Sequence, residues 1–316
     1  MKVLTTGASG FVGNAMCNRL VAQGLDTVGT VRKLPARRLP NVDYRIVGDL
    51  DADTDWRTAL AGVEGIIHCA ARVHVMHETA GDPLMAFRSA NVAGTGQLAR
   101  QAAAAGVKRL VFVSSIKVNG EETAVGFSEG DAPAPQDPYG QTKWEAEQML
   151  SQISNETGLE VVIVRPPLVY GPGVKGNLAR LLSWVERGVP LPLAGICNTR
   201  SLIGIDNFTS TLHACLTHPA AAGRTYLVRD GEDISTPELV RRLGNHLDKP
   251  ARLFTLPPPL LERLAGLVGR RADAQRLTGS LIVDDSRIRR ELGWVPPRTL
   301  DEGLAQMAHA WLDSTR

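Results

Sequence analysis

Short apolar runs alternate with helical stripes through the first half of the chain. We expect strands at 2–6, 26–31, 44–50, 65–71, 109–115 and 160–167. We expect helices at 55–62, 83–106 and 139–153, and a further one after the first strand, where apolar side chains recur every three or four residues. Nearly continuous apolar strands that alternate with helices predict a parallel sheet covered on both faces. The pattern therefore predicts an α/β, doubly wound protein whose ligands bind at the carboxyl ends of the strands.

The regular alternation ends at about residue 166. Helices are expected within 173–188, 235–247, 260–268 and 299–312, and Ser235 with Glu238 and Thr299 with Glu302 form the pattern of capping boxes. We expect two domains, a sheet domain over 1–166 and a smaller, mostly helical C-terminal substrate lobe over 167–316. Some segments of the second part are expected to return to the first domain.

Size and charge restrict the possible partners of the protein. The chain has 316 residues, with 22% charged and 43% apolar side chains and a net charge of +2, so no strong field favours nucleic acid or an acidic membrane. No apolar stretch reaches the roughly 20 residues of a membrane span, and the N-terminal run is too short for a signal peptide. The four cysteines show no metal-ligand spacing. We expect a cytoplasmic enzyme with no metal site.

Three glycines follow the first strand at a spacing of three residues, in the segment "TTGASGFVG". Glycine allows the backbone to turn tightly and to approach a phosphate, and the amides at the start of the next helix attract an anion. A turn between the first strand and the first helix of an α/β series indicates dinucleotide binding. The expected pyrophosphate contacts are Gly7, Gly10, Phe11, Val12 and Gly13.

The end of the second strand indicates which dinucleotide is bound. NAD-binding folds usually have an acidic residue there, whereas this chain has Val31 followed by Arg32. An arginine at this place can hold a 2′-phosphate. We therefore favour NADP(H) over NAD(H). The alternative is that Arg32 stacks on the adenine or points to water.

The segment "YGQTK" places Tyr139 and Lys143 four residues apart at a helix start, and hence on one face. A nearby ammonium and an oxidised nicotinamide favour the phenolate, so Tyr139 can act as a general acid or base on a substrate oxygen. Lys143 can also bind the nicotinamide ribose. Ser115 ends the fifth strand and can hydrogen-bond the same substrate oxygen. An exposed helical Tyr–Lys pair is the alternative, and the serine and the glycine turn argue against it.

In combination, GxxGxxG, "HCAA", "NVAGT", "SSIKVNG", "YGQTK" and "RPPLVYGPG" resemble the extended short-chain dehydrogenase/reductases, the NAD-dependent epimerase/dehydratase family. The resemblance covers nearly the whole chain and implies a Rossmann-like sheet domain. It also implies a cofactor site that includes Asp49, Leu50, Ala70, Ala71, Asn91 and Pro166. By the same resemblance, Asn177 would bind the nucleotide and Arg200 the diphosphate of a nucleotide sugar. His74 would lie over the sugar.

Within this family the chain looks closest to bacterial UDP-sugar 4-ketoreductases of surface-polysaccharide (O-antigen, lipopolysaccharide) biosynthesis, which form UDP-N-acetylquinovosamine. The alternative is a UDP-hexose 4-epimerase that retains NAD. Leu168 and "VNG" at 118–120 depart from the epimerase pattern, and Ile116-Lys117 replaces the acidic pair of the 4,6-dehydratases. A catalytically inactive sensor or scaffold, and flavonoid- or steroid-type reductases, remain weaker alternatives. A homodimer through the helices at 83–106 and 139–153 is expected from the family.

Overall fold

Seven parallel strands form the main sheet of the computed structural model, which describes residues 1–73, 82–267 and 271–315. Across the sheet they are β10 (Thr225–Leu227), β7 (Glu160–Arg165), β5 (Arg109–Val113), β4 (Gly65–His68), β1 (Lys2–Thr6), β2 (Asp26–Val31) and β3 (Val42–Ile46). The chain adds β2 and β3 on one side of β1 and the later strands on the other side. The strand order therefore reverses between β1 and β4, where a doubly wound sheet forms its ligand crevice. The predicted α/β, Rossmann-like sheet is confirmed.

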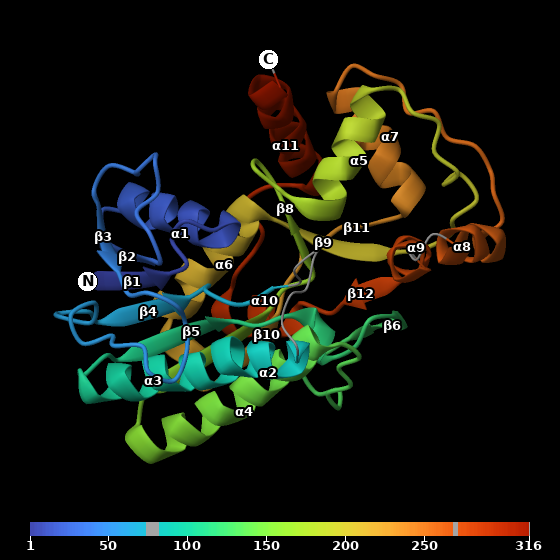
Figure 1. Ribbon diagram of the computed structural model, residues 1–316. Helices are drawn as coiled ribbons and strands as arrows, with labels where there is room; N and C mark the ends of the chain where they lie inside the picture. Colours follow the sequence, from blue (N-terminus) through green and yellow to red (C-terminus); the bar gives the residue numbers. More distant parts are fainter. Residues whose placement is uncertain (74–81, 268–270, 316) are drawn as a thin grey trace.

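Helices cover both faces of this sheet (Figure 1). One face is covered by α1 (Phe11–Ala22) and α6 (Ile205–Thr217), and the other by α2 (Pro83–Arg88), α3 (Thr95–Ala104) and α4 (Pro138–Thr157). Strand β5 shows how one strand serves both layers. Leu110 and Phe112 pack in the core cluster with α3 and α4, whereas Val111 packs with α1 and α6. Successive side chains of a strand point to opposite faces, so both faces of β5 are apolar after Arg109.

The expected helix at 83–106 forms with a change of winding in its middle. A π-helical segment, Ser89–Gly94, joins α2 to α3 without a break. Such wider turns are rare and often occur at functional sites. Here the segment includes Asn91, one of the predicted cofactor residues.

The helix expected at 55–62 was a wrong prediction, because these residues form turns rather than a helix. The side chain of Gln101 on α3 binds the backbone at the entrance of this segment. Its amide donates to the Thr54 carbonyl (3.0 Å) and its oxygen accepts from the Trp56 amide (2.8 Å). These bonds replace the first helical ones, while Trp56 and Leu60 are still buried in the core. The strand expected at 44–50 is shifted, since β3 is Val42–Ile46.

A smaller sheet that the sequence pattern did not predict joins β6 (Thr123–Phe127), which comes from the first half of the chain, to strands of the second half. Its strands are β11 (Asp233–Ile234), β9 (Arg200–Gly204), β12 (Leu281–Val283) and β6 (Thr123–Phe127), with β8 (Leu168–Tyr170) paired to β9. The helices of this half are α5 (Gly176–Glu186), α7 (Thr236–His246), α8 (Pro258–Leu267), α9 (Arg271–Thr278), α10 (Ser286–Leu292) and α11 (Leu300–Thr315). Figure 1 shows α5, α7 and α11 together in a lobe beside the main sheet.

The two predicted capping boxes differ in how completely they form. At α11 both arms are present, since the Thr299 amide donates to Glu302 (2.8 Å) and the Glu302 amide donates to Thr299 (3.3 Å). At α7 the Glu238 amide donates to Ser235 (3.3 Å), but the Glu238 carboxylate binds Arg242 (3.1 Å).

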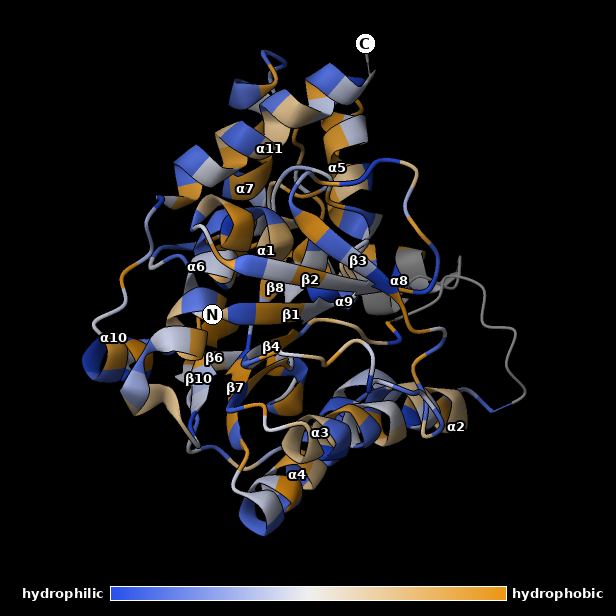
Figure 2. Cartoon of the chain, turned by 90° about the vertical axis from the view of Figure 1, so that its left-hand side faces the viewer, coloured by the Kyte–Doolittle hydropathy of each residue, from blue (hydrophilic) through white to orange (hydrophobic). Residues whose placement is uncertain are grey.

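Two elements from the second half of the chain pack as part of the main-sheet domain. Strand β10 pairs with β7, and α6 packs over the central strands. The division at residue 166 itself stays a prediction. Figure 2 shows hydrophobic residues along the inner strands β1 and β7 and hydrophilic ones on the edge strand β3. In the described part of the chain, no helix combines the length and the apolar character needed to cross a membrane.

Candidate active site

Each of the three glycines after β1 has a structural reason. Gly7 has a φ of +65°, and a Cβ on it would lie 3.1 Å from the Ala70 backbone. A Cβ on Gly13 would lie 2.2 Å from the Gly7 carbonyl oxygen, which is impossible without movement of the loop. Gly10 precedes α1 and offers no side-chain cap, so the first amides of the helix, at Phe11 and Val12, are left for a ligand. This turn fits the pyrophosphate of a dinucleotide.

The loop after β4 lies beside this turn because Thr6 links the two strands. The Thr6 hydroxyl accepts a hydrogen bond from the Ala70 amide (2.9 Å) and forms a second hydrogen bond with His68 Nδ1 (2.7 Å). His68 Nε2 forms a hydrogen bond with the Thr95 hydroxyl on α3 (3.0 Å). The sheet therefore brings Ala70 and Ala71 next to the glycine turn, as the resemblance implies.

The residues expected around the adenosine end gather at the carboxyl ends of β2 and β3. Val31 is buried, while Arg32 and Asp49 are 79% and 81% exposed at the side chain, with 3.7 Å between Arg32 Nη1 and Asp49 Oδ1. Leu50 packs against the π-helical segment, because a Cβ on Gly94 would lie 2.7 Å from Leu50 Cγ. The Arg32 guanidinium is thus available to a ligand, with one acidic neighbour.

Asn91 holds the cofactor-side loop to the catalytic helix. Its side chain accepts from the Arg72 amide (2.8 Å) and donates to the Arg72 carbonyl (3.0 Å) and to the Thr142 hydroxyl (3.2 Å). Thr142 lies between Tyr139 and Lys143 on α4. The buried Asn91 side-chain amide therefore links the backbone at Arg72 to α4, and its role toward a cofactor stays a prediction.

Helix α4 presents Tyr139 and Lys143 on one side. Its N-cap is Asp137, whose side chain accepts from the Gly140 amide (2.7 Å). Lys143 Nζ donates to the Val113 carbonyl (2.8 Å), lies 4.5 Å from the centre of the Phe112 ring and 5.8 Å from the centre of the Tyr139 ring. The ammonium is therefore fixed between β5 and the phenol.

Ser115 reaches the same place from the end of β5. Its hydroxyl accepts from the Lys117 amide (3.3 Å), and the short 3₁₀ turn that it caps, Ile116–Val118, abuts the start of α4. A Cβ on Gly140 would lie 2.9 Å from the Lys117 carbonyl oxygen. The Pro166 carbonyl accepts from the Ile116 amide (2.9 Å). Ser115, Tyr139, Lys143 and Pro166 are thus brought together by three separate elements.

The electrostatics of the pair differ from the sequence-based expectation. Burial lowers the pKa of Lys143 to about 8, against the opposing effects of Cys69 and Glu147. Burial raises the pKa of Tyr139, and the Asp137 carboxylate raises it further. The expected lowering of the Tyr139 pKa by Lys143 is therefore not found in the protein alone, because burial and the Asp137 carboxylate act in the opposite direction. The positive charge of an oxidised nicotinamide is left as the main source of such lowering.

Two of the predicted nucleotide-sugar residues, Asn177 and Arg200, lie in the second half of the chain. Arg200 begins β9, and its Nη1 donates to the Gly279 carbonyl (2.9 Å). Burial lowers the pKa of Arg200 and nearby Glu121 and Glu122 oppose this, while Arg276 adds to the lowering. Asn177 is exposed near the start of α5. His74 lies outside the described residues. The roles of all three stay predictions.

Two groups of charged residues near the site were missed by sequence reasoning. The Lys117 ammonium pairs with Glu121 (2.8 Å) and with Asp137, the cap of the catalytic helix. Glu147 pairs with Arg165 inside the protein. A signal for the second pair was present, because Glu147 falls on the same apolar stripe of α4 as Ala146 and Leu150. The sequence held no comparable indication of the ion pairs of Lys117 with Glu121 and Asp137.

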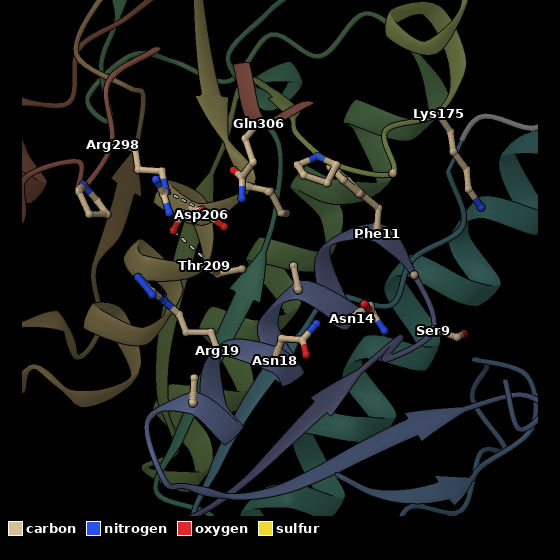
Figure 3. A pocket seen from close by; sticks show the side chains of 17 residues that line it. Ser9, Phe11, Asn14, Asn18, Arg19, Lys175, Asp206, Thr209, Arg298 and Gln306 are labelled. Atoms are coloured by element: carbon tan, nitrogen blue, oxygen red, sulfur yellow. Dashed lines mark hydrogen bonds and ion pairs between the residues drawn. The ribbon is translucent and has the colours of Figure 1, made fainter. Parts of the chain in front are cut away.

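A cavity of about 910 Å³ touches the glycine turn from outside this site (Figure 3). It is bounded by Ser9, Gly10 and Phe11, by the outward face of α1, and by the ion pair between Asp206 and Arg298 (2.7 Å). Ser115, Tyr139 and Lys143 are not among its lining residues. We therefore do not place the reaction in this cavity.

Comparison with known proteins agrees with this geometry. Residues 3–228 match the model of the NAD dependent epimerase/dehydratase family. The chain belongs to this family. It is 43% identical to a UDP-glucose 4-epimerase of Vibrio cholerae, over 99% of this chain and 96% of that protein. It is 26% identical to the N-acetyl-alpha-D-glucosaminyl-diphospho-ditrans,octacis-undecaprenol 4-epimerase of Escherichia coli O157:H7, over 96% of this chain and 92% of that one.

A solved structure extends the similarity to the whole fold. The structure of MoeE5 in complex with UDP-glucose and NAD matches with a TM-score of 0.79 and 26% identity, and each chain is covered completely. The protein is therefore an enzyme of the epimerase/dehydratase family, built on a parallel seven-stranded sheet.

Proposed function

We propose that this family member moves a hydride to or from C4 of a UDP-linked hexose derivative. The main observation that supports this proposal is that Ser115, Tyr139 and Lys143 lie at the carboxyl ends of the central strands. They lie beside a glycine turn that fits a pyrophosphate. Related proteins with UDP-sugars in their names or complexes support the class of substrate.

The protein's own residues handle the proton and the position of the sugar. Tyr139 exchanges a proton with the oxygen on C4, and Ser115 donates a hydrogen bond to the same oxygen. Lys143 adds positive charge beside the phenol, and an oxidised nicotinamide would add the larger part of the charge that favours the phenolate. A bound nicotinamide supplies or accepts the hydride. We assign Arg200 and Asn177 to the nucleotide part, with Arg276 as a second cation because it lies near enough to affect Arg200.

Our first candidate reaction is reduction of a 4-keto-6-deoxy-N-acetylhexosamine, as in the formation of UDP-N-acetylquinovosamine. C4 would receive a hydride from the reduced dinucleotide, which would be released in its oxidised form. Tyr139 would donate its proton to the emerging alkoxide. Such an enzyme must exchange its cofactor in every turnover. The exposed Arg32 guanidinium at the end of β2 supports this candidate, since it suits the 2′-phosphate of NADPH.

The second candidate is 4-epimerisation, and the 43% identity to a UDP-glucose 4-epimerase specifically supports it. In this case the hydride leaves C4 and the hydroxyl proton goes to Tyr139. Both return after the keto sugar has turned, so no net oxidation occurs. An epimerase regenerates its oxidised dinucleotide and can retain it. Elimination of water is disfavoured in either case, because Lys117, held by Glu121, stands where a dehydratase has a carboxyl group.

The cofactor and a substrate panel separate the two candidates. The purified protein is examined for bound dinucleotide and titrated with NADPH and NADH. UDP-glucose, UDP-N-acetylglucosamine and UDP-2-acetamido-2,6-dideoxy-xylo-hexos-4-ulose are then assayed with each. Consumption of NADPH with the keto sugar supports the reductase. Retained NAD with interconversion of two hexoses supports the epimerase. No turnover of any UDP-sugar contradicts the proposal.

Three further expectations stay predictions at this point. They are the homodimer through the α2–α3 and α4 helices, the place in surface-polysaccharide biosynthesis, and the cytoplasmic location. The similarity to the undecaprenol-linked 4-epimerase is compatible with the second of them.

A further inference from the structure

Four buried polar side chains lie directly behind the catalytic residues. Each follows or precedes a site residue closely in the chain: Ser114 is next to Ser115, Glu147 is one helical turn after Lys143, Arg165 is next to Pro166, and Asn119 follows the turn that Ser115 caps. Their exposed fractions are only 2–4%. Burial of charged groups is costly unless they are paired and hydrogen-bonded, so such a cluster requires an explanation.

The four side chains form one connected network. The Glu147 carboxylate accepts from the Ser114 hydroxyl and from Arg165 Nε (2.9 Å). Arg165 Nη1 donates to the Asn119 side-chain oxygen (3.0 Å), and the Asn119 amide donates to the Ser128 carbonyl (2.9 Å). The Arg165 guanidinium also lies 5.9 Å from the centre of the Trp144 ring.

The network joins the three segments that carry the site. At the end of β5, the Val113 carbonyl accepts from Lys143, the Ser114 hydroxyl donates to Glu147, and Ser115 follows. Two successive turns of α4 are thus fixed to two consecutive residues at the end of β5, Val113 and Ser114. Arg165 adds β7, whose Val164 carbonyl accepts from the Ser114 amide (2.8 Å). A shift of Glu147 would therefore move Ser115 relative to Lys143.

We propose that Glu147 is a positioning residue for the reaction assigned above, on which this inference rests. Through Ser114 it sets the distance between Ser115 and the Lys143 ammonium, and its negative charge keeps that ammonium protonated. The buried arginine balances the carboxylate so that it can lie in the core, and Asn119 satisfies the arginine.

The charges around Lys143 support the electrostatic part of this role. The titratable groups that face it are His68 and Cys69 at the end of β4, and Tyr139 and Glu147 on its own helix. Burial lowers the pKa of Lys143 to about 8, and Glu147 opposes this effect. Without the carboxylate, the pKa of Lys143 falls further and the fraction of charged lysine near pH 8 decreases.

The test compares Glu147→Gln with Glu145→Gln, which removes the same charge two residues away. Glu145 lies at the protein surface, where it pairs with Arg88 (2.7 Å). Two quantities are measured from pH 6 to pH 10: kcat/KM, and the rate of Lys143 acetylation by acetic anhydride, followed by mass spectrometry. We expect the high-pH loss of kcat/KM and the onset of Lys143 acetylation to move to lower pH in Glu147→Gln, with about a tenfold loss of kcat/KM at pH 8. Glu145→Gln should match the wild type.

Ser114→Ala separates position from charge, because it removes the hydrogen bond and keeps the ion pair. We expect a lower kcat with an unchanged pH profile. If Glu147→Gln does not fold, Glu147→Gln with Arg165→Met replaces it, since a neutralised pair leaves no unpaired buried charge. The charge role would be overturned if the pH profile of folded Glu147→Gln matched that of the wild type. The double variant is compared in the same way when it takes the place of Glu147→Gln. An unchanged kcat in Ser114→Ala would overturn the positioning role.

The acetylation measurement needs no substrate. If no UDP-sugar is turned over but the Lys143 titration still moves in Glu147→Gln, the proposed function has failed and the charge role of Glu147 stands. If turnover is observed and neither quantity moves, the proposed function stands and the charge role has failed.

Discussion

At the residue scale, Tyr139 and Lys143 are held in surroundings that oppose the charged form of both. Burial raises the pKa of the phenol and lowers that of the ammonium, and the Lys143 proton donors are directed at the Val113 carbonyl. The free protein therefore keeps Tyr139 neutral. An oxidised nicotinamide would add positive charge next to the phenol and favour the phenolate, which couples acid–base chemistry to cofactor binding.

Replacing Tyr139 by Phe tests this chemistry most directly. We expect kcat to fall by about 10²–10⁴, because proton transfer is lost, while dinucleotide affinity stays within about threefold of the wild type. Steady-state kinetics and a fluorescence titration measure the two quantities. Tyr44→Phe is the matched control, since its hydroxyl accepts only a weak bond from the Leu39 amide (3.4 Å) on the other side of the sheet. Retained activity in Tyr139→Phe would contradict the assignment.

The predicted role of Arg32 in the choice of cofactor is tested at the same scale. If it binds a 2′-phosphate, Arg32→Ala should weaken NADPH binding by about tenfold, as expected for loss of a charge-assisted bond, and leave NADH binding unchanged. Titration of both reduced dinucleotides provides the comparison, and Arg37→Ala on the exposed loop after β2 serves as a control. Equal weakening of both cofactors would show that Arg32 contacts the adenine instead.

At the element scale, the strand–turn–helix unit β1–α1 depends on the absence of side chains. The Gly13→Ala methyl would meet the Gly7 carbonyl oxygen at 2.2 Å, so the turn must open or α1 must shift. We expect a loss of about 1–3 kcal/mol in the free energy of unfolding, typical of overpacking, and dinucleotide binding at least tenfold weaker.

Gly130→Ala is the control for this substitution, because its methyl has nothing nearer than Ser128 Oγ at 3.7 Å. Urea unfolding and dinucleotide titration are compared in both variants. Wild-type binding by Gly13→Ala would mean that the turn is not the phosphate site.

Elements also differ in how well the sequence predicted them. Six strands of the main sheet and α4 were predicted, because most of these segments are apolar runs or are clearly periodic. The seventh strand, β10, has three residues and was missed. The strands of the second sheet have two to five residues, and their pairings join distant parts of the chain, such as β6 with β12. Such short segments have no detectable period, and only their partners make them strands.

At the scale of the whole molecule, His68 connects β1, β4 and α3 as a buried neutral ring. Burial and the nearby Lys143 lower its pKa to about 3, compared with 6.5 for a free histidine. The unfolded chain binds a proton at His68 below pH 6.5 and the folded chain does not. This contribution to stability is therefore complete above pH 6.5 and is lost as the pH falls toward 3, at about 1.4 kcal/mol per unit.

Urea unfolding at pH 7.5, 6 and 5 checks this effect. We expect the free energy of unfolding of the wild type to fall more steeply with acid than that of His68→Gln, by about 1–2 kcal/mol between pH 6.5 and 5. His309→Gln, at an exposed position on α11, should keep the wild-type slope. The same slope in all three proteins would mean that the ring titrates normally.

The sheet domain is completed by residues far along the chain. Phe208, Leu212 and Leu216 of α6 fill one face of the main sheet, and β10 extends its edge. We therefore expect a fragment of residues 1–166 to show no cooperative unfolding transition, because it lacks these parts. Circular dichroism against urea, with the full chain alongside, makes the comparison. A cooperative transition in the fragment would show that the first domain is independent.

The sequence by itself determined the parallel sheet, the glycine turn and the Tyr139–Lys143 pair, because each depends on residues that are close together in the chain. The patterns are apolar runs, three glycines three residues apart, and two residues one helical turn apart. It also placed Ser115 at a strand end. Local periodicity acts over a few residues, so the chain needs no distant partner to express it.

Only the tertiary structure decided what these residues touch. It directs Lys143 to the Val113 carbonyl rather than to the phenol, places the Glu147–Arg165 pair behind Ser115, and binds the Gln101 side chain to Thr54 at the entrance of the turns at 55–62. In each case the partner lies 18 to 47 residues away along the chain. Burial, which shifts the pKa of both Tyr139 and Lys143, is likewise a property of the packed molecule and not of any segment.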